Sequence, residues 1–400
     1  MKKSIAIIGC GPSALLFASF IDTEKYDVVI YEKNAAPARK FLVAGDGGFN
    51  LTYSEPSIQF IQKYTPSHFL KKSIQHFSNN DLQNFLKKIG IETYIGSSKR
   101  IFPVKGIKPI DVLNAILNYI KSKKIELKTK HTWKGWNEKN ELLIEHNNSY
   151  TNVTADYTIF SLGGASWNIT GSDGKWFGLF NEKGIQTIPF QPSNCAYKVD
   201  WQPGFISKYE GFSLKNIELS CNNQSKKGEL IITKFGLEGS PIYALSPQIR
   251  TLLNSGKKAD IYIDLKSMLS PEEIEKRIFS SAGNKSLSKH LHDQLKLNKV
   301  EIDLIKHQLS KEEYLDLKML SKSIKHLPII LTDFAPIDEA ISTVGGIALS
   351  EVNENFELKN LSRNYILGEM LDWDAPTGGY LLQGCFSMGA FLANVFNTYT

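Results

Sequence analysis

The chain has 400 residues, a length that accommodates two or three domains around a large buried core. Hydrophobic residues make up 42% and charged residues 22%, which is typical of a globular protein and unlike a disordered or fibrous one. The net charge of +6 comes from lysines scattered along the whole length without a basic block, so we expect no nucleic-acid partner. The four cysteines are far apart and form no CxxC pair, so we expect neither a metal site nor a disulfide scaffold.

The start of the chain resembles a targeting signal only superficially. The apolar run before Gly9 is five residues long, which is shorter than the core of a secretory signal. No apolar stretch reaches the roughly 18 residues that a membrane span needs. We therefore expect a cytoplasmic protein without a membrane partner.

The first forty residues predict a βαβ unit. Residues 4–8 indicate a buried strand, a helix should follow from Ser13 to Ile21, and residues 27–31 indicate a second buried strand. The turn between them reads GCGPSA, in which the two glycines permit a tight turn and close approach of the backbone to a pyrophosphate. The free N–H groups of the helix N-terminus would bind the phosphates.

An acidic residue completes this pattern. Glu32 ends the second strand, where a carboxylate accepts hydrogen bonds from the adenosine ribose. The candidate cofactor-binding residues of the βαβ unit are Gly9, Gly11, Pro12, Ser13, Ala14 and Glu32.

Helices and strands alternate along the next hundred residues. The polar segment 57–89 predicts helices, and residues 110–122 predict another helix after Pro109. The alternating segments 125–136, 141–146 and 149–154 predict a β-meander, and Trp133 in the first of them is included among the candidate cofactor-binding residues. Residues 157–162 predict a buried strand that runs into Gly163 and Gly164.

The pattern then changes to that of an inserted segment. Short strands separated by turns predict a β domain over 189–265, and lysine-rich helices follow over 266–327. From residue 328 the sequence is again rich in glycine and apolar residues, as it is near the N-terminus. We therefore predict a first part of a dinucleotide-binding domain at 1–188, the two inserted segments, and a return to that domain at 328–400.

A second motif, RKFLVAGDGGFNLT, covers residues 39–52. Its glycines, Gly45, Gly47 and Gly48, would remove side chains from the face of a flavin ring, and a domain that binds only NAD has no need of them directly after its ribose acid. Arg39 or Lys40 could neutralise the pyrophosphate.

A third motif covers residues 366–390. A strand ends at Gly368 and Glu369, Asp372 follows, and a turn with Gly378 and Gly379 leads into an apolar helix. A carboxylate here could bind ribityl hydroxyls. The helix N-terminus could face the flavin edge on which negative charge develops during reduction.

These motifs together resemble the BaiN/aminoacetone-oxidase-like family of FAD-dependent oxidoreductases. The similar stretches include GCGPSA, KRIFPV, LGGASWNITGSDGKW and GEMLDWDAPTGGYLLQGCFSMGA, in family order from residue 4 to 394. The resemblance implies an α/β fold with a Rossmann-like FAD-binding domain of the glutathione-reductase type, an inserted β-barrel-like domain and a helical subdomain. It places flavin contacts at Gly9, Gly11, Glu32, Lys33, Lys40, Asn50, Gly163, Gly164, Glu369 and Asp372, and the adjoining motif residues Gly346 and Tyr380 are added to them.

The chain departs from the family in the second motif. Gly48 and Phe49 stand where many relatives carry an Arg-Cys pair, so activities ascribed to those relatives transfer poorly. Amine oxidation and double-bond reduction both stay open. The catalytic residues are unknown, and the candidates for substrate contact are Asp46, Arg100, Tyr243, Asp374, Tyr380 and Cys385. Each of the eight histidines is interpreted as a surface residue.

We expect an FAD-dependent oxidoreductase that binds its flavin without a covalent bond and acts on a small molecule. A flavin-dependent RNA-modifying enzyme and a flavin-binding protein without catalysis are the alternatives. No second GxGxxG turn lies between a strand and a helix, so NAD(P)H would reach the flavin only as a diffusible reductant. The substrate pocket is expected between the insertion and the flavin, lined by residues 46–50, Tyr243 and 344–346.

Overall fold

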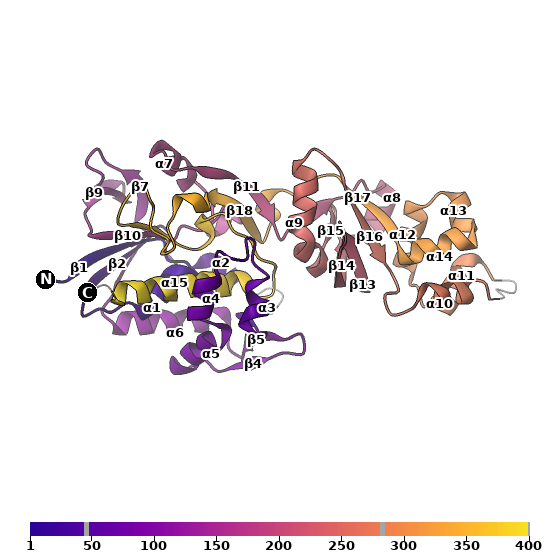
Figure 1. The fold of residues 1–400 in the computed structure, drawn as a ribbon, viewed down its shortest axis with the longest axis horizontal. Helices are drawn as coiled ribbons and strands as arrows, with labels where there is room; N and C mark the ends of the chain where they lie inside the picture. The colour runs from indigo at the N-terminus through magenta and orange to yellow at the C-terminus, as the bar shows by residue number, and fades with distance from the viewer. Residues whose placement is uncertain (44–47, 281–284, 399–400) are drawn as a thin grey trace. The chain divides into compact units, whose positions relative to one another are not determined.

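Apolar runs from the beginning, middle and end of the chain form one five-stranded parallel sheet. The strands lie in the order β19-β10-β1-β2-β6, and Figure 1 labels β10, β1 and β2 of this sheet. Their bounds are β1 (Lys3–Ile8), β2 (Tyr26–Glu32), β6 (Glu126–Thr129), β10 (Tyr157–Phe160) and β19 (Asn364–Ile366). Ile7 of β1 lies in register with Ile30 and Ile159 on its two neighbours, and all three are fully buried. The loops that follow these parallel strands meet at one edge of the sheet, where this class of fold binds its ligands.

The computed structural model describes residues 1–43, 48–280 and 285–398, and the chain forms two units. Unit 1 comprises Met1–Gln191 and Ser342–Thr400, and unit 2 comprises Pro192–Ile341. Unit 2 is therefore one continuous insertion into unit 1. The predicted return at 328 is too early, because residues 327–331 complete the sheet of unit 2 and the change of unit falls at 341/342.

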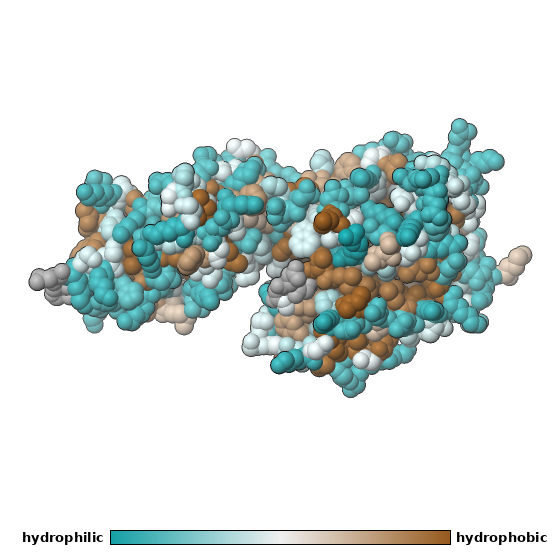
Figure 2. All heavy atoms as spheres, turned by 180° about the vertical axis from the view of Figure 1, so that it is seen from behind, coloured by the Kyte–Doolittle hydropathy of each residue, from teal (hydrophilic) through white to brown (hydrophobic). Residues whose placement is uncertain are grey.

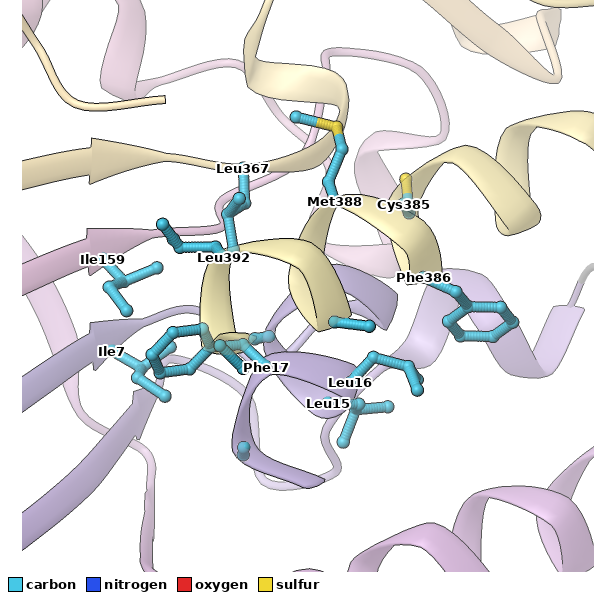
Figure 3. Packing of buried hydrophobic residues seen from close by; sticks show 14 of the residues in the cluster. Ile7, Leu15, Leu16, Phe17, Ile159, Leu367, Cys385, Phe386, Met388 and Leu392 are labelled. Carbon is cyan, nitrogen blue, oxygen red and sulfur yellow. The ribbon is translucent and has the colours of Figure 1, made fainter. Parts of the chain in front are cut away.

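Long helices cover the parallel sheet. α1 (Pro12–Phe20), α6 (Pro109–Ser122) and α15 (Tyr380–Thr398) lie on one side of it in Figure 1. α15 packs so closely on α1 that a Cβ at Gly389 would come within 2.1 Å of the Ser13 carbonyl oxygen. Figure 3 shows Phe17 of α1 and Leu392 of α15 among the buried side chains between the helices and the sheet, near Ile7 and Ile159. This interface forms the core of unit 1.

Smaller elements complete unit 1. A meander of β7 (Thr132–Trp136), β8 (Leu142–His146) and β9 (Ser149–Val153) packs its two tryptophans against Phe160 and Phe180. The other sheets are β3 (Thr52–Tyr53), β5 (Arg100–Pro103) and β4 (Thr93–Ile95), and the pair β11 (Thr187–Ser193) and β18 (Ser342–Ile347). The remaining helices are α2 (Arg39–Val43), α3 (Ser57–Ile61), α4 (Lys71–His76), α5 (Asn79–Lys88), α7 (Trp176–Glu182), η1 (Asn168–Thr170), η3 (Leu349–Glu351) and η4 (Gly368–Met370).

Unit 2 is built on an antiparallel sheet in the order β12-β15-β14-β13-β16-β17. The strands are β12 (Tyr197–Lys198), β13 (Ser213–Cys221), β14 (Gln224–Ile232), β15 (Gly236–Glu238), β16 (Ala259–Asp264) and β17 (Leu327–Leu331). Backbone hydrogen bonds join Lys198 to Asp333 at 2.8 Å and to Thr332 at 2.9 Å, just beyond β17. The two outer strands are thus connected, and the sheet closes on itself as the predicted barrel requires.

The helices of unit 2 share one hydrophobic core with its sheet. They are α8 (Pro203–Tyr209), α9 (Ser240–Asn254), α10 (Pro271–Ile278), α11 (Leu287–Leu295), α12 (Lys299–Gln308), α13 (Lys311–Leu315), α14 (Leu317–Lys325) and η2 (Ile337–Glu339). Five of them lie in the predicted helical segment, whereas α8 and α9 fall in the segment predicted as strands. The predicted meander strand 125–136 also divides, because residues 126–129 pair with β2 in the parallel sheet.

Hydrophilic residues cover most of the visible surface of both units, and a contiguous hydrophobic area is visible on unit 1, at the right of Figure 2. Among the helices that the structure describes, none is long and apolar enough to cross a membrane.

Candidate functional site

The turn after β1 brings backbone N–H groups to the edge of the parallel sheet. Gly9 has φ +92°, and a Cβ there would lie 2.4 Å from the carbonyl oxygen of Ser161 in the loop after β10. Gly11 is the N-cap of α1 and provides no side-chain hydrogen bond to the helix. Pro12 follows at the first helical position, so the first turn of α1 presents unpaired N–H groups and the positive end of its dipole. This arrangement suits an anion.

Glu32 connects the end of β2 to this turn. The residue is 6% exposed, and its carboxylate accepts hydrogen bonds from the Cys10 backbone N–H at 3.0 Å and from the backbone and side-chain nitrogens of Asn34 at 2.8 and 3.0 Å. A carboxylate has about four acceptor positions, so one remains for a ligand. A ribose hydroxyl is the donor that a βαβ unit offers at this place.

A cavity of about 460 Å³ runs along this edge of the sheet, wholly within unit 1. The predicted cofactor-binding residues that line it are Gly9, Gly11, Pro12, Ser13, Glu32, Lys33, Arg39, Lys40, Trp133, Gly163, Gly368 and Glu369, together with Cys385. Five cationic side chains and three carboxylates border the cavity, a formal net charge of +2. That charge balances a diphosphate.

The two basic residues of α2 have different surroundings. Lys40 Nζ lies 3.0 Å from Glu369 Oε2 and donates to Ser166 Oγ at 2.9 Å, so Glu369 already compensates its charge. Arg39 is exposed at the rim and has no carboxylate partner among the described residues. Of the two predicted cations, Arg39 is therefore the one whose charge is available to a phosphate.

The other described residues of the predicted set do not line the cavity. Ala14 is fully buried inside α1. A Cβ at Gly164 would lie 2.2 Å from Thr343 Oγ1, and one at Gly346 would lie 2.4 Å from the Met370 carbonyl oxygen. Asp372 accepts a hydrogen bond from the Gly345 N–H at 2.9 Å. The remaining members of this group are Gly48, Asn50, Gly378, Gly379 and Tyr380, whereas Gly45, Asp46 and Gly47 lie outside the described residues.

Two of the predicted substrate-contacting residues meet at the N-terminus of α15. Tyr380 donates its hydroxyl hydrogen to Glu55 at 2.8 Å and stacks on Tyr53 with 5.3 Å between ring centres. A Cβ at Gly378 would lie 3.9 Å from Arg100 Nε, and the positive charge of Arg100 acts on the Tyr380 hydroxyl. Burial, reinforced by the hydrogen bond to Glu55, raises the pKa of Tyr380, so this hydroxyl stays protonated at neutral pH.

The other candidates differ in position. Cys385 borders the cavity, and burial, followed by the charge of Glu369, raises the pKa of its thiol. Asp374 is 4% exposed and forms a backbone bridge with Thr65, which points to a structural role. Tyr243 lies on α9 in unit 2, where burial raises its pKa.

The structure adds cavity residues that sequence analysis missed. His131 lines the wall and stacks on His146 with 4.1 Å between ring centres, although both were interpreted as surface residues. Residues 170–173 and Lys175 also line it. They belong to the LGGASWNITGSDGKW stretch, and the similarity of this stretch to the family was the signal from which they could have been identified.

The model of the HI0933-like protein Rossmann domain matches residues 3–395. The chain belongs to this family. The match confirms the family resemblance seen in the motifs. A 3-dehydro-bile acid delta(4,6)-reductase from Clostridium scindens is 23% identical over 415 residues, which cover 96% of this chain and 97% of the relative.

Two solved structures share the fold of this HI0933-like chain. A 3-ketosteroid-delta4-(5alpha)-dehydrogenase from Rhodococcus jostii RHA1 has a TM-score of 0.50 at 11% identity, covering 98% of this chain and 97% of the other. A 3-ketosteroid delta1-dehydrogenase from Sterolibacterium denitrificans has a TM-score of 0.51 at 11% identity, with both chains covered completely. These similarities establish the predicted Rossmann-type α/β architecture with an additional domain.

The residues present in the HI0933-like chain fit a bound dinucleotide. The buried Nε1 of Trp133 and Oγ of Ser172 have no hydrogen-bond partner within the described part of the chain, and both residues line the cavity. Unpaired buried polar groups are costly in a folded protein unless a ligand or water satisfies them. Together with the glycine turn and the net positive charge, they suit a ligand that carries phosphates and hydroxyl groups.

Proposed function

We propose that this chain is an FAD-dependent oxidoreductase that holds its flavin without a covalent bond and acts on a small molecule. The observation that carries the proposal is the cavity at the N-terminus of α1, which is lined by both Glu32 and Glu369 and has a formal net charge of +2. Only a dinucleotide uses a pyrophosphate turn and a ribose acid together.

Different residues of the chain would bind different parts of FAD. The N–H groups of Gly11 and Ser13 and the charge of Arg39 would hold the pyrophosphate, and Glu32 would accept from the adenosine ribose. The Lys40–Glu369 pair would face the ribityl chain. FAD, when bound, supplies the acceptor and donor of electrons, while the protein positions the substrate and excludes water.

The N-terminus of α15 is the proposed place for substrate contact. Arg100 supplies a positive charge and hydrogen-bond donors there, whereas the Tyr380 hydroxyl gives its one hydrogen to Glu55. A carbonyl oxygen is a group that the Arg100 guanidinium would orient. The curated relative is a reductase of a 3-dehydro-bile acid, so a carbon–carbon double bond conjugated to a carbonyl is the first substrate class to test.

The test begins with the purified protein. Chromatography of the cofactor released by denaturation should give FAD in about equimolar amount to the chain, and absorbance spectra should show an oxidised flavin. Anaerobic titration of the reduced protein with conjugated enones then follows its reoxidation. Release of FMN, or no flavin even after incubation of the protein with FAD, would refute the assignment.

A further inference from the structure

Residues 170–175 cross the cavity edge in a short loop, which we call the strap. Two hydrogen bonds fix its C-terminal end to the loop after β10. The Gly174 N–H donates to the Gly164 carbonyl oxygen at 3.2 Å, and the indole N–H of Trp176 donates to the Gly163 carbonyl oxygen at 2.9 Å. The residues of the strap that line the cavity are Thr170, Gly171, Ser172, Asp173 and Lys175. The strap therefore contributes a substantial part of the cavity wall from a segment far from the first βα turn.

The free side of the strap meets the loop that follows β2. Lys33 Nζ lies 3.1 Å from Asp173 Oδ2, and the two side chains are 30% and 15% exposed. Gly171 adopts φ +97°, and a Cβ there would come within 2.6 Å of Asn34 Nδ2. An ion pair and a close packing contact thus join two loops that are more than 130 residues apart in sequence.

The contact is next to the proposed ribose acid. Asn34 donates to Glu32 through both its backbone and its side-chain nitrogen. The same loop is anchored from the far side, because the backbone N–H groups of Lys130 and His131 donate to the carbonyl oxygens of Asn34 and Glu32. The β2 loop is therefore a rigid support, and the strap rests on it at the adenosine end of the cavity.

We propose that the strap closes over the adenosine half of the bound cofactor and that the Lys33–Asp173 ion pair fastens it. The inference rests on the proposed FAD site. Opening the ion pair frees one side of the strap, so the pair should control how fast FAD leaves. The buried hydroxyl of Ser172, which has no partner within the described residues, gives the closed strap a hydrogen-bonding group for the same ligand.

The experiment measures FAD release after dilution of the holoprotein, followed by the rise in flavin fluorescence. Lys33→Met and Asp173→Asn each remove one charge at nearly constant size and should speed release about threefold to fivefold, the upper range for a partly exposed ion pair. The charge-swapped double variant Lys33→Asp/Asp173→Lys should return the rate toward that of the wild type. Raising ionic strength should speed release from the wild type by a larger factor than from Lys33→Met, which has no Lys33–Asp173 pair to screen.

Lys87→Met is the matched control. Lys87 lies 4.0 Å from Glu92, both side chains are largely exposed and neither lines the cavity, so its loss should change the rate by less than a factor of two, as expected for an exposed pair. ADP provides a second readout through isothermal titration of the apoprotein. ADP should bind more weakly to Lys33→Met than to the wild type, whereas riboflavin, which lacks the adenosine half, should not discriminate between them.

The outcomes separate this inference from the proposed function. A wild-type protein that binds no FAD overturns the proposed function itself. A protein that binds FAD but releases it at the same rate in all variants, or whose charge-swapped variant is as fast as the single variants, overturns the strap. Faster FAD release from Lys87→Met than from Lys33→Met would also contradict it.

Discussion

Glu32 serves two purposes in this fold. Its carboxylate holds the N–H groups of Cys10 and Asn34, and it retains one acceptor position for the proposed ribose. Glu32→Ala should weaken FAD binding by about 1.5–3 kcal/mol, the range for a hydrogen bond to a charged group. That corresponds to roughly tenfold or more in the dissociation constant, measured by flavin fluorescence.

Asp27→Ala is the control for Glu32→Ala. Asp27 lies on the same strand, and its side chain is 72% exposed, so its removal should leave FAD affinity within a factor of two. Equal affinity of Glu32→Ala and the wild type would exclude Glu32 as a cofactor ligand.

The cysteine thiols are protected from modification. All four cysteines are buried, and burial raises the pKa of Cys10 and of Cys385. Because the thiolate is the reactive form, the native protein should react with a disulfide reagent far more slowly than free cysteine between pH 7 and 9. Four thiols should appear after denaturation.

Cys385→Ser tests the thiol at the cavity. It should lower the count in the denatured protein to three and leave the slow native reaction unchanged, because the other three cysteines remain buried. If one thiol of the native protein reacted rapidly, and this rapid reaction were absent in Cys385→Ser, Cys385 would be accessible from the cavity as a thiolate.

Single residues were predictable where local chemistry specifies them. The turn at Gly9 and Gly11 needs particular backbone angles and a particular spacing, so its position in the cavity wall could be read from the sequence. His131 and Asp173 could not be found in this way. A histidine after a strand and an aspartate in a glycine-rich loop have no distinctive local pattern, and only the folding of distant segments brings them to the same cavity.

At the scale of elements, the crossing of α1 and α15 depends on one glycine. A Cβ at Gly389 would lie 2.1 Å from the Ser13 carbonyl oxygen and 2.8 Å from the Phe17 nitrogen, both backbone atoms of α1. Gly389→Ala should therefore force the helices apart and lower the free energy of unfolding by about 1–3 kcal/mol. Urea unfolding followed by circular dichroism measures it.

Gly178→Ala is the matched control for the helix crossing. Gly178 lies within α7, and a Cβ there would meet nothing within 4 Å. Alanine has the better helix propensity, so this variant should be as stable as the wild type or more stable by up to about 1 kcal/mol. Similar destabilisation in both variants would show that the close approach of α1 and α15 is not what Gly389 provides.

Elements with a strong hydrophobic periodicity could be predicted from the sequence, whereas elements that depend on pairing between distant segments could not. The helix after Pro109 begins and ends as expected, because a proline at its first position and a regular apolar face define it. The helix α9 was missed, since Pro247 in its interior argues against a helix in any local reading. The assignment of β17 to unit 2 depends on pairing with β16, which no local pattern reports.

At the scale of the whole molecule, the topology of the sheets decides whether NADH or NADPH has a binding domain separate from that of FAD. The sheet of unit 1 that carries the glycine turn is parallel, and the sheet of unit 2 is antiparallel. An antiparallel sheet provides no βαβ turn for a second pyrophosphate. Stopped-flow reduction of the FAD-loaded protein by NADH or NADPH should therefore be slow and saturate weakly. Saturation at micromolar concentration would reveal a dedicated nicotinamide site.

The strands β11 and β18 lie side by side, and a Cβ at Gly345 would come within 2.5 Å of the Pro189 carbonyl oxygen. The chain therefore leaves unit 1 and returns to it at neighbouring points, although 150 residues intervene. A short turn could connect those points directly. Residues within unit 2 can therefore be added, replaced or removed without changing the order of the strands in the parallel sheet of unit 1.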